Sequence, residues 1–201
     1  MRIFNKRNVF VMILLMLCIF TVTSVSASDL NATDDVITAV NTVDEISVNE
    51  KTEILSVNYT PKTFDEIQTA VDSASDGDTV ILDGYYQFNS TVTVYKQLNF
   101  VGINDATVDG NKNVGLFIVS DNGVTFNNIT FKNGNSANDK GGAIYFIKNV
   151  DGGYVMNCNF VGNSALGGGA IYFAKGGNIV NCSFINNIGI SSAMTGGAVF
   201  F

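Results

Sequence analysis

From residue 79 to the end of the chain, short apolar segments alternate with turns rich in Gly, Asn and Asp. Each segment alternates or stays apolar for three to six residues, a pattern that predicts β-strands. The segments before the first repeat occupy residues 79–84, 90–95, 98–102, 106–110, 115–120, 124–126 and 129–131. Strands this short and regular are typical of a sandwich, a barrel or a solenoid, so the class is all-β.

One stretch before the strands has helical periodicity. Its apolar face is formed by Phe64, Ile67, Ala70, Val71 and Ala74. Thr63 and Glu66 have the spacing of a capping box, in which the hydroxyl and the carboxylate bind the first free backbone N–H groups. We therefore expect one capping helix over about 64–75 and no second helix after it.

An internal repeat decides among the β architectures. "GGAIYF" occupies 141–146 and again 168–173, and "GGAVFF" occupies 196–201. Aligning the preceding residues forms two columns, one of Asn128, Asn157 and Asn181 and one of Phe131, Phe160 and Phe184. A period of about 24 to 29 residues that holds several short strands predicts one coil of a parallel β-helix.

The stacking of coils explains the residue types. Like residues lie above like at a strand spacing of ~4.8 Å, so apolar columns fill the lumen. We expect these side chains to point inward: Ile144, Phe146, Ile171, Phe173, Val199 and Phe201. We expect these outside: Ala143, Tyr145, Ala170 and Tyr172. The alternation alone is also compatible with the opposite phase.

Glycine and asparagine are expected to form the corners of each coil. The paired glycines would supply positive φ and close backbone approach where a long turn re-enters a strand. These pairs are Gly141 and Gly142, Gly168 and Gly169, and Gly196 and Gly197. Asn128, Asn157 and Asn181 would adopt the left-handed conformation and hydrogen-bond from coil to coil.

The N-terminus has the pattern of a secretory signal. Arg2, Lys6 and Arg7 precede an apolar run over 9–20, and small residues follow up to Ala27. We predict a signal peptide over 1–27, an acidic linker over 28–60 and the β-helix over 61–201, with coils from 79. An uncleaved membrane anchor is the alternative, although the apolar run is shorter than the ~20 residues that span a bilayer.

The net charge of the chain restricts the classes of partner that we expect. Without residues 1–27 the chain keeps 8 Lys and 18 acids, a formal net charge of −10. Such a surface repels nucleic acid and anionic membranes, so we expect no nucleic-acid partner. Contact with a membrane is expected only through the signal peptide or a missing C-terminal anchor.

The repeat carries a family resemblance. "GGAIYF" with "FVGN" (160–163) and "FINN" (184–187) resembles the repeats of the chlamydial polymorphic outer membrane proteins. The order of signal peptide, acidic spacer, helix and coils more closely resembles adhesin-like surface proteins of methanogenic archaea. Both belong to the pectin-lyase-like superfamily. Over about 61–201, the resemblance implies a right-handed, single-stranded parallel β-helix that is secreted or displayed on the cell surface, in the outer membrane if the source is a Gram-negative-type bacterium.

The chain departs from this pattern in two places. The first coil has Gly134 where the repeat has Asn, with Asn135 one place late. The chlamydial proteins are autotransporters, but residues 1–201 include no anchoring module, so the resemblance does not imply that export route. Because the sequence stops inside the third copy of the repeat, we expect an N-terminal fragment of a longer chain. An uncapped last coil would otherwise expose its lumen.

The superfamily includes pectate lyases and polygalacturonases, which use Arg or Lys with calcium, or several Asp with His and Arg. This chain has no His, and its only arginines lie in the signal peptide. The acids of the coils sit singly beside Gly or Asn and are interpreted as turn residues: Asp105, Asp109, Asp121, Asp139 and Asp151. Asp76 and Asp78 are too few for calcium. We expect no catalytic, cofactor or metal site.

Two further features concern modification. Cys158 and Cys182 fall in one column and are interpreted as two stacked buried thiols, with a disulfide as the alternative. Sequons occur at Asn31, Asn58, Asn89, Asn128 and Asn181. Asn58 and Asn89 are the better acceptors, because Asn128 and Asn181 belong to the corner column.

The sequence therefore predicts a secreted, adhesin-like protein whose non-enzymatic β-helix is a rigid stalk or a binding surface. The expected partners are glycans or cell-surface proteins. The alternative is the N-terminal part of a carbohydrate-active lyase or hydrolase with its catalytic coils beyond residue 201. A purely structural stalk is the third interpretation.

Overall fold

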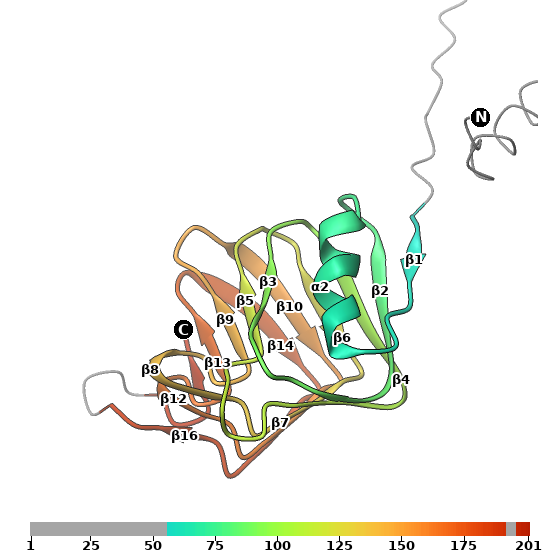
Figure 1. The fold of residues 1–201 in the computed structure, drawn as a ribbon. Coiled ribbons are helices and arrows are strands. Elements are labelled where there is room, and N and C mark those ends of the chain that lie inside the picture. Colours follow the sequence, from blue (N-terminus) through green and yellow to red (C-terminus); the bar gives the residue numbers. More distant parts are fainter. Residues whose placement is uncertain (1–55, 192–195) are drawn as a thin grey trace, which may run out of the picture. The chain divides into compact units, whose positions relative to one another are not determined.

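A computed structural model describes residues 56–191 and 196–201 of the chain. The predicted signal peptide, the Asn31 sequon and most of the predicted linker lie outside the described residues. The described part is a parallel β-helix of about five turns with one helix, as the repeat predicts (Figure 1). No helix in the part of the chain that the structure describes is long and apolar enough to cross a membrane.

The first two coils contain two strands each, and the next three contain four each. The first two consist of β2 (Thr79–Gln87) and β3 (Val92–Val94), then β4 (Asn99–Asp109) and β5 (Phe117–Val119). The third consists of β6 (Thr125–Asn127), β7 (Thr130–Lys132), β8 (Asn135–Lys140) and β9 (Ile144–Phe146). The fourth consists of β10 (Asp151–Met156), β11 (Asn159–Val161), β12 (Ser164–Gly167) and β13 (Ile171–Phe173). The fifth consists of β14 (Gly176–Val180), β15 (Ser183–Ile185), β16 (Ile188–Gly189) and β17 (Val199–Phe200).

These strands form three parallel sheets. One follows the order β14-β10-β6-β4-β7-β11-β15, with β2 on the other side of β4; the others are β16-β12-β8 and β17-β13-β9-β5-β3. The predicted strands 98–102 and 106–110 are one continuous strand, β4. Its first half pairs with β6 and its second half with β7. Asn104 and Asp105, with φ of 50° and 56°, turn the corner inside that strand.

The predicted phenylalanine column is confirmed. Phe131, Phe160 and Phe184 are direct partners in adjacent strands, and successive rings stack with centroids 4.9 Å apart. Phe146 stacks on Phe173 in the same way at 4.6 Å. Offset stacking of this kind adds about 0.5–1.5 kcal/mol per pair beyond the burial of the rings.

The predicted phase of the third strand is right for its strand residues and wrong for the two alanines that precede it; Tyr172 points outward as predicted, although neighbouring rings cover it. Ile144, Phe146, Ile171 and Phe173 are buried as expected, but Ala143, Ala170 and Tyr172, expected outside, are buried too. The two alanines lie at the corner between two sheets and belong to the main apolar cluster. Tyr172 is covered by the rings of Tyr145 and Phe200.

Within the described residues, the fifth coil is packed against a neighbouring coil on one side only. Val199, expected inward, is half-buried against the core. Phe201, also expected inward, stacks on Phe173 at 5.2 Å, yet 64% of it remains exposed. The inward direction is therefore right for both residues, although their burial is incomplete.

The paired glycines were expected to supply positive φ, and where they do so it is at the first glycine of the pair. This holds for Gly141 (60°) and Gly168 (57°) but is wrong for Gly196, whose φ is outside the left-handed region. The second glycines allow close approach. A Cβ on Gly142 would lie 2.3 Å from the carbonyl oxygen of Gly169, whereas a Cβ on Gly197 in the last coil would meet nothing within 4 Å.

The asparagine corners are left-handed as predicted, but their side chains do not form one continuous ladder. Asn128, Asn157 and Asn181 have φ of 58°, 53° and 51°. Asn181 donates from Nδ2 to Oδ1 of Asn157 at 2.8 Å, and Asn157 donates to Oδ1 of Asn127 rather than to Asn128. Asn128 instead donates to the carbonyl oxygen of Gly102 at 2.9 Å, because no asparagine precedes it in that column.

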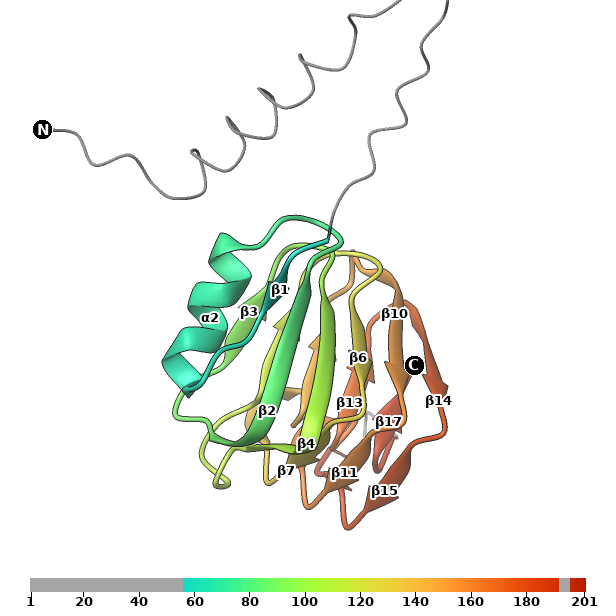
Figure 2. The same cartoon turned by 90° about the vertical axis from the view of Figure 1, so that its right-hand side faces the viewer.

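The helix α2 (Phe64–Ser73) covers the first coil, beside the short strand β1 (Asn58–Tyr59) (Figures 1 and 2). Its predicted apolar face is confirmed, with Ile67, Ala70, Val71 and Ala74 buried. The predicted capping box is wrong, since the Thr63 side chain makes no capping bond and Glu66 accepts from the N–H of Lys62. The helix ends two residues earlier than expected, because Ala74 is extended. β1 lies within the predicted linker and pairs with β2.

Candidate functional site

A groove of about 320 Å³ opens beside β5 and β8, on the outside of the second and third coils. Its apolar lining comes from Val114, Phe117 and Ile118. Its polar lining comes from Thr91, Asn113, Asn135, Ser136, Asp139 and Lys140. Apolar lining with a few polar groups is the usual composition of a ligand site, although this groove is at the small end of the range.

Hydrogen bonds between coils hold the walls of the groove. Thr91 donates from Oγ1 to the carbonyl oxygen of Gly115 at 2.8 Å. Asn135 donates from Nδ2 to the carbonyl oxygen of Lys112, also at 2.8 Å, and its backbone N–H bonds to Val114. Within the described residues, Oδ1 of Asn135 accepts no hydrogen bond. This carbonyl oxygen is therefore available to a ligand hydroxyl.

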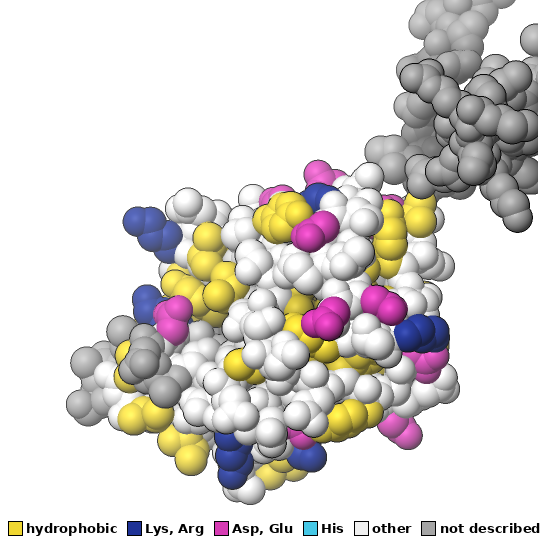
Figure 3. Space-filling model, in the orientation of Figure 1, with side chains coloured by type: hydrophobic (Ala, Val, Ile, Leu, Met, Phe, Trp, Pro, Cys, Tyr) yellow, Lys and Arg dark blue, Asp and Glu magenta, His cyan; other side chains and the backbone are white. Residues whose placement is uncertain are grey.

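A column of side chains on the outer face of the third sheet continues from the groove. We call it the outer column: Ile118, Tyr145, Tyr172 and Phe200, which are partners in successive strands. Tyr145 meets Tyr172 edge-on at 5.5 Å, and Phe200 stacks on Tyr172 at 4.5 Å. In Figure 3 hydrophobic side chains gather beside β9 and β13, with single charged groups near them.

Lys140 joins the groove to the outer column. Its Nζ lies 4.7 Å from the ring centroid of Tyr172 and 5.8 Å from that of Tyr145. Lys140 forms no ion pair with any carboxylate of the described residues. The Asp139 carboxylate accepts the backbone N–H of Lys140 at 2.9 Å. One cation and one anion thus border the groove, which leaves it close to neutral.

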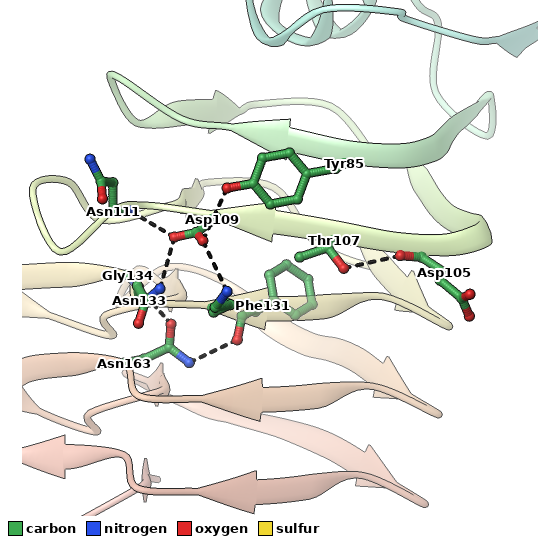
Figure 4. Close-up of polar contacts among 10 residues, drawn as sticks. Tyr85, Asp105, Thr107, Asp109, Asn111, Phe131, Asn133, Gly134 and Asn163 are labelled. Carbon is green, nitrogen blue, oxygen red and sulfur yellow. Dashed lines mark hydrogen bonds and ion pairs between the residues drawn. The ribbon is translucent and has the colours of Figure 1, made fainter.

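A second polar cluster surrounds Asp109, where the sequence predicts an ordinary turn residue. Its carboxylate accepts from Tyr85 Oη, the N–H of Asn111 and Nδ2 of Asn133, and pairs with Lys132 at 3.4 Å (Figure 4). Burial alone would raise the pKa of Asp109, but these bonds and the lysine lower it overall. Four groups from three coils already bind this carboxylate. Its role is therefore to hold neighbouring coils together.

The remaining coil acids are mixed in their roles. Asp121, in the bend after β5, binds the next backbone N–H, as expected of a turn residue. Asp139 makes the same bond, but it lies inside β8. The turn interpretation is wrong for Asp139 and for Asp151, which begins β10 and pairs with Lys175 at 3.2 Å. Asp105 offers its backbone carbonyl oxygen to the hydroxyl of Thr107 (Figure 4).

The two acids in the turn after α2, Asp76 and Asp78, have structural roles. Asp78 is buried, and its two oxygens accept the N–H groups of Val57 and Ser75 at 2.7 and 2.8 Å. Asp76 accepts the N–H of Gln97. The interpretation of both acids as turn residues is confirmed. Over residues 56–191 and 196–201 no group of three or more His, Cys, Asp or Glu is arranged to hold a metal.

The sequence-based list of site residues omits Asn163, the Asn of "FVGN". Its side chain is fully buried and bonds the preceding coil twice, accepting the N–H of Gly134 and donating to the carbonyl oxygen of Phe131 (Figure 4). Asn187 repeats part of this arrangement one coil later. The departure at Gly134 is structural, since a Cβ there would lie 2.1 Å from the carbonyl oxygen of Gly142.

Both described cysteines are free, so the disulfide alternative is wrong. The N–H of Cys158 donates to Sγ of Cys182 at 3.4 Å, which confirms the stacked thiols. Cys158 is buried, and burial raises the pKa of its thiol to about 12. Cys182 is only half-buried, contrary to expectation, because no further coil covers it within the described residues.

The two preferred sequon asparagines are exposed. Asn58 lies in β1, and Asn89 lies in the turn between β2 and β3. Asn128 and Asn181 are exposed as well, but their side-chain amides donate hydrogen bonds at the corners. The amides of Asn58 and Asn89 make no side-chain bond among the described residues, so the geometry leaves these two positions open to modification.

The chain was compared with known proteins at the levels of family, sequence and structure. No family model matches it, and no curated protein and no solved structure matches it either. The function is therefore argued from the residues and geometry above.

Proposed function

We propose that the chain is part of a secreted, adhesin-like surface protein of the pectin-lyase-like superfamily whose β-helix binds glycans without cleaving them. The observation that carries the proposal is the groove with the outer column beside it. Pyranose rings present both C–H faces and hydroxyl groups. Ile118 and Tyr145 offer the apolar surface that packs on the C–H faces, and Asn135 and Asp139 offer acceptors for the hydroxyls.

The solenoid supports this function because it makes the surface rigid before binding. The walls of the groove are bonded to neighbouring coils, and the floor residue Phe117 is buried in the core. A ligand therefore loses little affinity to the ordering of protein side chains. The near-neutral border suits uncharged sugars, because the pair of Asp139 and Lys140 adds no net charge.

Binding without turnover is supported by the composition of the groove. Glycoside hydrolysis of the usual kind needs two carboxyl groups that flank the scissile bond. The groove contains one carboxylate, Asp139, and one lysine, Lys140. These two groups lie at the border, where each is suited to hydrogen bonding with hydroxyls.

The test is retention of the full chain on immobilised polysaccharides, scored together with release of reducing or unsaturated ends. We expect retention on at least one neutral glycan and no release. Tyr145→Ala and Asn135→Ala should each lower retention at least fivefold. Tyr154→Ala is the matched control, because Tyr154 is a 44% exposed tyrosine on another sheet, and should bind as the wild type does.

Two results would contradict the proposal. Release of sugar ends from any polymer would assign the chain to an enzyme. Retention that is lost equally in Tyr154→Ala and Tyr145→Ala would move the binding surface away from the groove. The unfolding temperatures of the three variants should agree within a few degrees, since all three side chains lie outside the lumen.

A further inference from the structure

Two asparagines of the chain are followed directly by glycine. Asn122 precedes Gly123 in the turn between β5 and β6, and Asn133 precedes Gly134 at the corner between β7 and β8. An asparagine in such a pair can modify itself, because the backbone nitrogen of the next residue can attack the side-chain Cγ and glycine has no Cβ to hinder the attack. Asparagine is accordingly counted among the thermolabile residues.

The surrounding coils block this reaction at Asn133. The N–H of Gly134 is buried and donates to Oδ1 of Asn163 at 2.8 Å, so this nitrogen is not free to attack (Figure 4). The Asn133 side chain donates from Nδ2 to the buried carboxylate of Asp109 at 3.0 Å, which fixes the orientation of the amide that would have to leave. Ring closure at this pair would break both hydrogen bonds inside the stack.

The same groups are accessible at Asn122. The residue is exposed, and within the described residues the N–H of Gly123 makes no hydrogen bond. Gly123 has a φ of 68°, in the left-handed region that residues with a Cβ rarely adopt. Gly123 itself is half-exposed, so water can accept the proton that its nitrogen loses. The nucleophile at this pair is therefore free and unhindered.

A neighbouring coil adds a hydrogen bond that favours the attack. The backbone N–H of Asp151, at the start of β10, donates to Oδ1 of Asn122 at 2.7 Å. This oxygen gains negative charge when the nitrogen of Gly123 bonds to Cγ, and a backbone donor that is already in place stabilises such a charge. The same bond restrains the Asn122 side chain, which lowers the entropic cost of reaching the reactive geometry.

We infer that Asn122 is a site of autocatalytic deamidation. The nitrogen of Gly123 forms a bond to Cγ of Asn122 and gives its proton to water, and the Cγ–Nδ2 bond breaks with release of ammonia. Water then opens the cyclic imide at either of its carbonyl groups, which leaves aspartate or isoaspartate at position 122. Water is the only co-reactant, and no atom is oxidised or reduced. The inference does not depend on glycan binding.

The reaction changes the charge and the backbone of a single turn. Each event adds one negative charge next to Asp121, while the carboxylate of Asp151 is already paired with Lys175 at 3.2 Å. The isoaspartate product also lengthens the backbone between β5 and β6 by one carbon. Because Asn122 is exposed and lies outside the lumen, the modified chain stays folded and accumulates as a more acidic form.

The test follows the full chain at pH 8 by peptide mass spectrometry, with ammonia release and ion-exchange chromatography as independent readouts. In the folded protein, we expect conversion at Asn122 to be at least about tenfold faster than at Asn133. In guanidinium, the two rates should agree within about twofold, and the rate at Asn122 should be no faster than in the folded chain. Asn122→Gln is the matched variant: it keeps an amide but closes the imide ring far more slowly, and should yield no acidic form. Asn122→Asp should elute with the aspartate product.

Three outcomes would overturn the inference. Equal rates at Asn122 and Asn133 in the folded protein would show that burial and hydrogen bonding do not select the site. A rate at Asn122 that rises on unfolding would show that the fold protects this asparagine instead of assisting its reaction. An acidic form that persists in Asn122→Gln would place the modification at another residue.

Discussion

Replacing Asn163 by alanine tests whether the FxxN position fastens each coil to the coil before it. The side chain is fully buried, and it accepts the N–H of Gly134 at 2.8 Å. Its amide donates to the carbonyl oxygen of Phe131 at 3.0 Å and to Oδ1 of Asn187 at 2.9 Å. Among the described residues, no other side chain bonds to the N–H of Gly134 or to the carbonyl oxygen of Phe131.

The expected cost follows from the partners left behind. A buried donor without an acceptor costs about 1–3 kcal/mol, and this applies to the N–H of Gly134, which is itself buried. Each bond lost from the amide adds roughly 1 kcal/mol. We therefore expect Asn163→Ala to lower the free energy of unfolding by about 3–5 kcal/mol, a large part of the stability of an ordinary domain.

The matched control is Asn187→Ala, one coil later. Asn187 accepts the N–H of Asn163 at 3.0 Å and donates to the carbonyl oxygen of Phe160 at 2.9 Å. Its side chain is only half-buried, so water can replace the lost bonds. We expect this variant to cost at least 1 kcal/mol less than Asn163→Ala, as measured by urea unfolding followed by circular dichroism.

Equal losses in the two variants would refute the reasoning, because burial would then not set the cost. A loss below about 0.5 kcal/mol for Asn163→Ala would refute it as well, since that is the range of an ordinary surface substitution. Asn163→Asp keeps the shape of the side chain and changes only its hydrogen bonding. It keeps the acceptor for Gly134 but replaces the amide donor by an anion, and should destabilise at least as much as alanine.

Three further predictions concern the turns and the lumen. Gly142→Ala places a Cβ 2.3 Å from the carbonyl oxygen of Gly169 and should cost about 1–3 kcal/mol or more by thermal unfolding, whereas Gly197→Ala, with nothing within 4 Å, should change little. Hydrogen bonds from two backbone N–H groups lower the pKa of Asp78, so its stabilisation is present above the unfolded pKa of ~3.9 and is lost as pH falls through the folded value. The difference in urea midpoint between wild type and Asp78→Asn should therefore shrink from pH 7 to pH 3, and a constant difference would contradict this. Iodoacetamide at pH 8 should label Cys158 only after unfolding, as peptide mass spectrometry would show, because burial raises its pKa to about 12.

The features that repeat could be predicted from the sequence for a physical reason. A parallel stack places like residues above like, so the columns through Phe131 and through Asn128 are visible in an alignment of the chain with itself. The apolar face of α2 is equally visible, because its period is fixed by the helix. The cap of that helix was missed, since Glu66 binds the N–H of Lys62 instead of that of Thr63.

The corners were harder to predict than the strands. The sequence from Gly102 to Asp105 looks like a turn between two strands, yet β4 stays paired with β2 on both sides of the bend. Two left-handed residues change the direction of the strand without ending it. Pairing with the previous coil keeps β4 continuous through the bend. The local sequence gives no sign of this pairing.

The groove could not be predicted, because it forms only where residues 113–118 of one coil meet β8 of the next, and the columns of the repeat do not include its polar positions. Asn113 and Asp139 face water, where many residues are tolerated, so their pattern carries little information. This tolerance makes the binding test interpretable. Substitutions there should change the free energy of unfolding by less than about 0.5 kcal/mol, whereas Phe160→Ala in the lumen should cost about 3–5 kcal/mol. A groove variant that loses glycan retention at unchanged stability therefore reports on binding rather than on folding.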